Sequence, residues 1–123
     1  MNNKKINKKP NCIIAARSGS KRLKNKNILK VNGYPLIHIV IKTAIKSKIF
    51  DKIIVSTDSK KIANIAKKAG AQVPFLRNKK LSGGKIILLD VIKDIILKTD
   101  CKYKKFNFVI YPTAILTQVK DIN

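Results

Sequence analysis

Short apolar runs alternate along this chain with longer segments in which apolar residues recur every three or four positions. The short runs have the length of buried strands, and the longer segments have the period of helices. Strand-like runs occupy residues 12–16, 52–57 and 106–113, and helical patterns occupy 36–46, 60–69 and 86–97. This order predicts an α/β fold with a mostly parallel sheet and right-handed crossover helices. Residues 71–76 are expected to be extended as well.

Local signals indicate where these elements begin and end. The Asn-Gly pair in "VNGYP", residues 31–35, predicts a tight turn, and Pro35 suits the first position of the helix behind it. Asp58 or Ser59 is expected to cap the second helix, and Gly70 to end it. The residues of that helix expected to face the core are Ile62, Ala63, Ile65 and Ala66.

The composition is that of one globular domain. The chain has 123 residues, of which 45% are hydrophobic, enough for a single core. Residues 1–10 form a basic N-terminal lead, and residues 11–123 are expected to form the domain. No apolar run approaches the ~18 residues of a membrane span, and the run at 12–16 is too short for a signal peptide. We therefore expect a cytoplasmic protein with no membrane partner.

The charge is strongly positive, with 28 Lys and Arg against 6 Asp and Glu and a formal net charge of +22. Such a charge attracts polyanions and predicts nonspecific, salt-sensitive contact with nucleic acid. Sequence-specific readers use arginine forks and stacking aromatic rings. Only Arg17, Arg22 and Arg77 are arginines, and there is no tryptophan. The composition therefore disfavours a sequence-specific reader.

The two cysteines, Cys12 and Cys101, lie far apart in the chain and match no metal-binding or redox spacing. We expect two reduced thiols, with Cys12 in the core.

A polar segment follows each predicted strand: "ARSGSKR" after the first, "STDS" after the second and "YPTA" at the end of the third. In open α/β sheets, ligands bind at the carboxyl ends of the strands. The pattern therefore predicts that these three segments share a binding site.

The first of these segments suits a phosphate. Arg17, Lys21 and Arg22 supply cations, Gly19 lets a ligand approach the backbone closely, and the serines on either side of Gly19 add hydroxyl donors. The glycine spacing matches neither the Walker loop nor the dinucleotide fingerprint. From spacing alone, a phosphate loop and a solvated basic loop both stay open.

The whole stretch "IIAARSGSKRLKNKNI" resembles the signature Ile-Ile-Pro-Ala-Arg-Gly-Gly-Ser-Lys-Arg-x-Pro-x-Lys-Asn-Ile of the acylneuraminate cytidylyltransferases, the CMP-sugar synthetases. The resemblance continues through "NGYPLI", "AIKSKIFDKIIVSTDS", "IANIAKKAGAQVPFLR" and "DVI", and it ends at "YPTAILT". The tyrosine of "YPTA" is most similar to the pseudaminic acid branch of that family.

The resemblance implies a Rossmann-like nucleotide-diphospho-sugar transferase fold. It also implies a reaction in which the anomeric hydroxyl of a nonulosonic acid, pseudaminic or sialic acid, attacks the α-phosphate of CTP. Pyrophosphate leaves, and Mg²⁺ is the implied cofactor. By position, Arg17 and Lys21 are the catalytic residues that clamp the triphosphate. The implied nucleotide-binding residues are Ala16, Gly19, Ser20, Asn27, Arg77 and Ser82.

Some positions depart from the family pattern. Ala15 and Lys24 replace signature prolines, and Ser18 replaces a glycine. Arg77 has a structural alternative, a salt bridge to Asp58 or Asp90. The role of Asp90 itself, which matches "DVI", stays open between orienting a loop and starting a helix.

Family members are considerably longer, and their C-terminal part carries the magnesium-binding aspartates, the sugar-acid site and the dimerisation element. We therefore expect a truncated, N-terminal nucleotide-binding part with no metal ligands of its own. Such a part would bind CTP but not turn over alone, with a complementing second half or a homodimer as possible partners. The alternatives are a non-catalytic basic module that binds polyanions or a partner subunit, and a drifted sequence that no longer folds stably.

Overall fold

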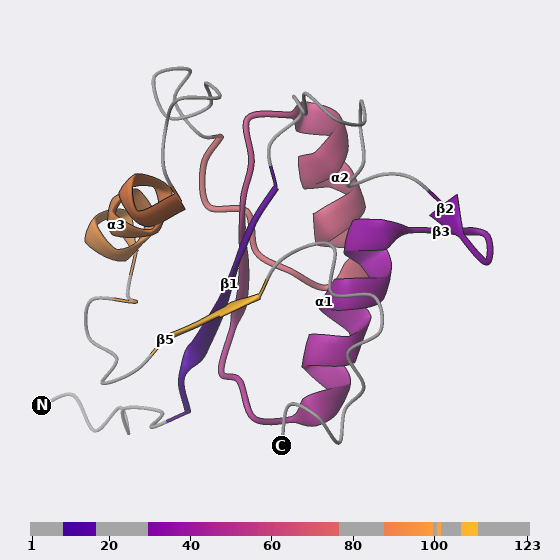
Figure 1. Cartoon of the computed structure of the whole chain (residues 1–123), viewed down its shortest axis with the longest axis horizontal. Helices are drawn as coiled ribbons and strands as arrows, with labels where there is room; N and C mark the ends of the chain where they lie inside the picture. The colour runs from indigo at the N-terminus through magenta and orange to yellow at the C-terminus, as the bar shows by residue number, and fades with distance from the viewer. Residues whose placement is uncertain (1–8, 17–29, 77–87, 100, 102–106, 111–123) are drawn as a thin grey trace, which may run out of the picture.

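Strand β1 (Asn11–Ala15) is the centre of a parallel sheet, paired with β4 (Ile53–Ser56) on one side and β5 (Asn107–Ile110) on the other (Figure 1). The computed structural model describes residues 9–16, 30–76, 88–99, 101 and 107–110. The register places Ile14 opposite both Val55 and Ile110. The α/β class and the parallel sheet expected from the sequence are confirmed.

The extended segment 71–76 continues the sheet beyond β4. Gln72 forms a parallel bridge with Ile54, and Leu76 forms one with Thr57. The amide of Gln72 donates to the Ile53 carbonyl at 2.8 Å, within ordinary hydrogen-bond range. The spatial order is therefore this segment, β4, β1 and then β5. Along the chain, β4 is placed beside β1 and the segment 71–76 beyond β4, whereas β5 is placed on the opposite side of β1. The strand order therefore reverses between β1 and β5.

Helices α1 (Leu36–Ser47) and α2 (Lys60–Ala69) cover one face of the sheet, and α3 (Leu88–Lys98) covers the other (Figure 1). The period of two along β1 divides its side chains between these layers. Cys12 and Ile14 pack into the core beneath α1 and α2, whereas Ile13 packs with Ile95 of α3. Both faces of the central strand are buried, as parallel sheets require.

The turn before α1 is a hairpin of β2 (Lys30–Val31) and β3 (Tyr34–Pro35). Asn32 and Gly33 have φ values of 53° and 86°, the positive values that a type I′ turn needs. The Asn-Gly prediction is confirmed. Pro35 is the N-cap of α1 with ψ 143°, not its first helical residue. The reason is that Pro35 still pairs with Lys30 in the hairpin, which keeps its backbone extended.

Helix α2 has the caps that its sequence predicts. The Ser59 hydroxyl, rather than Asp58, accepts the amide of Ile62 at 3.2 Å. Gly70 ends the helix with φ 109°, and the next amide, that of Ala71, reaches back to the Ala66 carbonyl. This pattern is a Schellman motif. Of the residues expected to face inward, Ile62, Ala63 and Ala66 are buried, and Ile65 is half-buried against the same core.

Several predicted boundaries moved by one residue. The first strand is Asn11–Ala15 in place of 12–16, the second strand begins at Ile53 and ends at Ser56, and α1 continues to Ser47. Helix α3 runs to Lys98, and 86–87 lie outside the described residues, as do 106 and 111–113 of the third predicted strand. At the other end of the chain, Lys9 and Pro10 of the expected lead contact the domain. The Lys9 ammonium donates to the Lys48 carbonyl at 3.0 Å, and the Pro10 carbonyl accepts the Asp51 amide at 2.8 Å.

Both cysteines are free thiols inside the core. Burial raises the pKa of the Cys12 thiol to about 12, because the thiolate would lose its hydration. The Cys101 sulfur accepts the side-chain amide of the buried Asn11 at 3.3 Å. The prediction that Cys12 belongs to the core is confirmed. None of the described helices has the length and apolar character to cross a bilayer.

Replacing Ser59 with Ala should lower the free energy of unfolding by about 0.5–2 kcal/mol, because the Ile62 amide loses its capping acceptor. The free energy of unfolding of Ser59→Asp should stay near that of wild type, since a carboxylate caps equally well. Its negative charge also interacts favourably with the positive end of a helix that begins with Lys60 and Lys61. Urea unfolding followed by circular dichroism measures both. Equal losses in the two variants would contradict the capping role.

Cys12 should resist labelling by a disulfide reagent at pH 8 in the folded Cys101→Ala variant, and it should react at once in urea. Rapid labelling of the folded chain would disprove the burial.

The stability of the chain should also depend on pH, with a sign that follows from the raised pKa of Cys12. As pH rises, the unfolded chain loses this proton first, so folding weakens between the ordinary thiol pKa and about 12. Cys12→Val should show a smaller loss of stability over that range.

Candidate functional site

The carboxyl end of β1 is held firmly in place. Ala16, the residue after the strand, is fully buried, and its amide donates to the Ser56 carbonyl at 2.8 Å. This bond attaches the end of β1 to the end of β4. The basic segment that begins at Arg17 is therefore joined to the core at this fixed point.

The end of β4 is shaped by two successive side-chain hydrogen bonds. Thr57 is fully buried, and its hydroxyl accepts the Ser59 amide at 3.1 Å. The Ser59 hydroxyl then accepts the Ile62 amide. The segment "STDS" thus turns the chain from the sheet directly into α2. Because β4 and β1 are parallel neighbours, this turn lies at the same edge of the sheet as Ala16.

Two more segments leave from this edge. Leu76 is level with Thr57 through their bridge, and Arg77 follows it in the chain. Ile110, the last residue of β5, pairs with Ile14, and "YPTA" follows it. The sheet therefore brings together the starting points of the three segments that the sequence singled out. Because the strand order reverses between β1 and β5, this edge is also the topological switch point, where such sheets bind ligands.

The described residues contain one of the predicted site residues, Ala16, which lies at this edge. The others lie outside the described residues; they are Arg17, Gly19, Ser20, Lys21, Asn27, Arg77 and Ser82. Asp90 is exposed in the first turn of α3, where a carboxylate stabilises the positive end of a helix. That position favours a role in starting the helix.

A hard cation such as Mg²⁺, the cofactor that the resemblance implies, needs oxygen ligands gathered at one point. Across residues 9–16, 30–76, 88–99, 101 and 107–110, no three His, Cys, Asp or Glu side chains come together in a way that could hold a metal ion. These residues therefore do not fit Mg²⁺.

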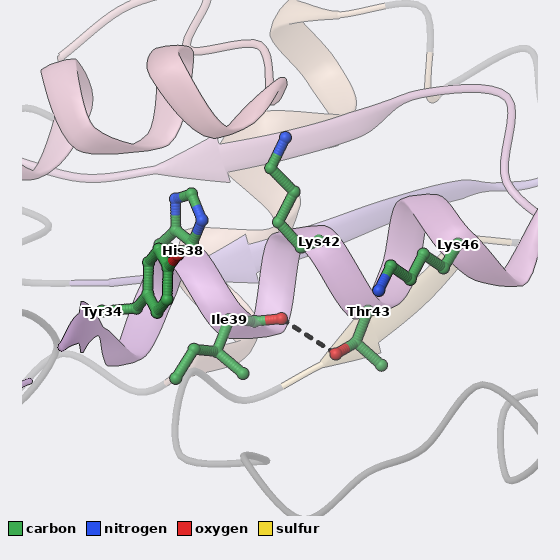
Figure 2. A pocket seen from close by; sticks show the side chains of 6 residues that line it. All are labelled: Tyr34, His38, Ile39, Lys42, Thr43 and Lys46. Carbon is green, nitrogen blue, oxygen red and sulfur yellow. Dashed lines mark hydrogen bonds between the residues drawn. The ribbon is translucent and has the colours of Figure 1, made fainter. Parts of the chain in front are cut away.

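A second feature, which sequence reasoning missed, lies on the outer side of α1. We name it the α1 hollow, a shallow depression of about 220 Å³ (Figure 2). The rings of Tyr34 and His38 stack at 5.1 Å between centroids and 14° between planes. The residues that line the hollow are Tyr34, His38, Ile39, Lys42, Thr43 and Lys46. The signal for it in the sequence is the spacing of four residues from Tyr34 through His38 and Lys42 to Lys46.

The comparisons with known proteins agree with the fold. A family model described as cytidylyltransferase matches residues 11–123. The chain is 40% identical over 113 residues to a pseudaminic acid cytidylyltransferase of Campylobacter jejuni, covering 90% of this chain and 48% of that protein. It is 43% identical over 93 residues to a CMP-N,N'-diacetyllegionaminic acid synthase of the same species, covering 76% of this chain and 40% of that protein. The chain therefore spans less than half the length of these relatives.

A solved structure of CMP:2-keto-3-deoxy-manno-octonic acid synthetase complexed with CTP superposes with a TM-score of 0.76 at 19% identity. It covers 92% of this chain and 44% of that one. At this identity the match concerns the fold. The parallel sheet, the reversal of strand order at β1 and the family match over residues 11–123 lead to one conclusion. The chain belongs to the cytidylyltransferase family.

Proposed function

We propose that this chain supplies the CTP-binding part of a cytidylyltransferase that converts a nonulosonic acid to its CMP-sugar. The observation that carries the proposal is the position of Ala16. Its buried, hydrogen-bonded place joins the basic signature segment to the switch point of the sheet. A triphosphate needs cations and backbone amides at that place, and Arg17, Gly19, Ser20 and Lys21 come next in the chain.

The sugar-acid class is supported by the names of the relatives. Two similar proteins act on pseudaminic and diacetyllegionaminic acid by name, and an N-acylneuraminate cytidylyltransferase of Streptococcus agalactiae is 44% identical over 90 residues. All three substrates are acidic keto-sugars. The "YPTA" segment after β5 favours the pseudaminic acid branch for this chain.

The proposed chemistry is positioning together with neutralisation of charge. Phosphoryl-type transfers gain most of their rate from holding the reacting groups in line and stabilising charge on the phosphate oxygens. Arg17 and Lys21 would hold the triphosphate, so that the sugar hydroxyl attacks the α-phosphate and pyrophosphate leaves. Asn27, Arg77 and Ser82 would contact the nucleotide. Mg²⁺ is the proposed cofactor of this reaction, and the described residues supply no ligand set for it.

CTP should raise the melting temperature of the chain, whereas ATP, UTP and inorganic triphosphate at equal concentration should not. A ligand at a hundred times its dissociation constant stabilises the fold by about 2.7 kcal/mol, which a thermal melt resolves easily. The measurement is a melt in magnesium buffer, followed by circular dichroism. An equal rise with all four compounds would indicate attraction by charge alone and would contradict a nucleotide site.

Lys21→Ala should abolish the CTP-dependent rise in melting temperature, and Lys26→Ala should leave it nearly unchanged. Both variants remove one lysine from the same segment, so the net charge changes equally. The difference is expected because Lys21 follows Gly19 and Ser20 directly and would bind the triphosphate, whereas Lys26 is expected to be solvated. Equal effects of the two substitutions would show diffuse charge in place of a defined site.

A further inference from the structure

The fold gathers positive charge on one layer. Helices α1 and α2 contain no acidic residue, and their lysines are all exposed: Lys42, Lys46, Lys60, Lys61, Lys67 and Lys68. Helix α3, on the opposite face, carries two aspartates and two lysines. One aspartate of α3 is already paired, since Lys98 and Asp94 form a salt bridge at 2.8 Å. The α1–α2 layer is therefore the surface of the described chain that suits a polyanion.

Within that layer, the α1 hollow combines cations with an aromatic platform. Tyr34 is 56% exposed, and His38 stacks on one side of its ring. Figure 2 shows the two rings at one end of this stretch of helix and Lys46 at the other, with Lys42 between them. The stack holds the tyrosine ring in one orientation before any ligand arrives, which lowers the entropy lost when a ligand stacks on it.

The spacing along α1 suits a linear anion. His38, Lys42 and Lys46 lie on one stripe of α1 because residues four apart share a helix face. Tyr34 precedes the helix in β3 and reaches the stripe by stacking on His38. Each step of four residues advances about 6 Å along the axis, a distance comparable to one nucleotide of an extended strand. Lys42 and Lys46 thus place positive charges one helical step apart, on the same stripe as the stacked Tyr34 ring.

We propose that the α1 hollow binds single-stranded nucleic acid without sequence preference, with a base stacked on Tyr34 and neighbouring phosphates at Lys42 and Lys46. Single-strand binders combine a basic groove that follows the backbone with aromatic side chains on which bases stack. An acidic peptide would use the lysines but leave the ring pair without a partner. The site shares no residue with the proposed CTP site.

The test uses the full chain and a fluorescein-labelled oligothymidine of about 12 nucleotides, within the usual range of such sites. Fluorescence anisotropy gives the affinity at several salt concentrations. Lys42→Gln/Lys46→Gln should reduce the slope of log affinity against log salt by about 1.4, since each phosphate contact on a single strand contributes about 0.7. The matched control, Lys67→Gln/Lys68→Gln, removes the same charge from α2 and should leave the slope nearly unchanged.

The aromatic half of the proposal has its own pair of variants. Tyr34→Ala should weaken binding at least about fivefold, as loss of one stacked base predicts, and Tyr34→Phe should stay near wild type because it keeps the ring. Unchanged thermal melts would show that both variants are folded, as expected at an exposed position.

Four results would overturn the proposal. The first is an equal loss of slope in the two lysine pairs, which means diffuse charge. The second is equal binding by the Tyr34→Ala and Tyr34→Phe variants, which means that no base stacks there. The third is displacement of the labelled oligomer by thymidine monophosphate as effectively, per nucleotide, as by unlabelled oligomer, which means a site for free nucleotides. If inorganic polyphosphate displaces the oligomer from wild type and from Tyr34→Ala equally well, the stacking contact is also excluded.

Discussion

The burial of β1 on both faces is the constraint on which the rest of the structure depends. Asn11, Cys12, Ile13 and Ile14 are all fully buried, and the strand pairs on both sides. The even-numbered residues Cys12 and Ile14 pack beneath α1 and α2, and the odd-numbered Ile13 packs beneath α3. At about 25 cal/mol per Å² of apolar surface, these contacts favour one register strongly, because a shift by one residue would exchange the two faces.

That central position also explains where the proposed site begins. A strand paired on both sides ends at a point between its neighbours, and here the chain passes first to β4 on one side of β1 and later to β5 on the other. The amide of Ala16 is used by Ser56, so the basic segment starts from a fixed place. Among the described residues, the core beneath it contains no charged side chain. Such rigid support suits the proposed site, which would have to position a triphosphate.

Most of the fold could be predicted from local patterns, because each pattern reports a local physical requirement. Ser59 begins α2 because an unpaired amide of the first turn needs an acceptor. Gly70 ends it because a residue without a Cβ adopts the left-handed conformation at no steric cost. Pro35 was misplaced because its fixed φ suits a strand end as well as a helix start, and pairing with Lys30 decided between them. The α1 hollow was not predicted, because each of its side chains taken alone is an ordinary exposed or half-buried residue.

The sequence by itself determined the alternation of strands and helices, the caps, the place of Cys12 in the core and the order of the signature segments. These depend on periodicity and on bonds between residues a few positions apart. Tertiary structure alone decided that β5 lies beside β1, that Leu76 lies level with Thr57, and that the lysines of α1 and α2 form one layer. Such features depend on contacts between segments far apart in the chain, whose geometry no local pattern contains. The strand order is set by which apolar faces can be buried together.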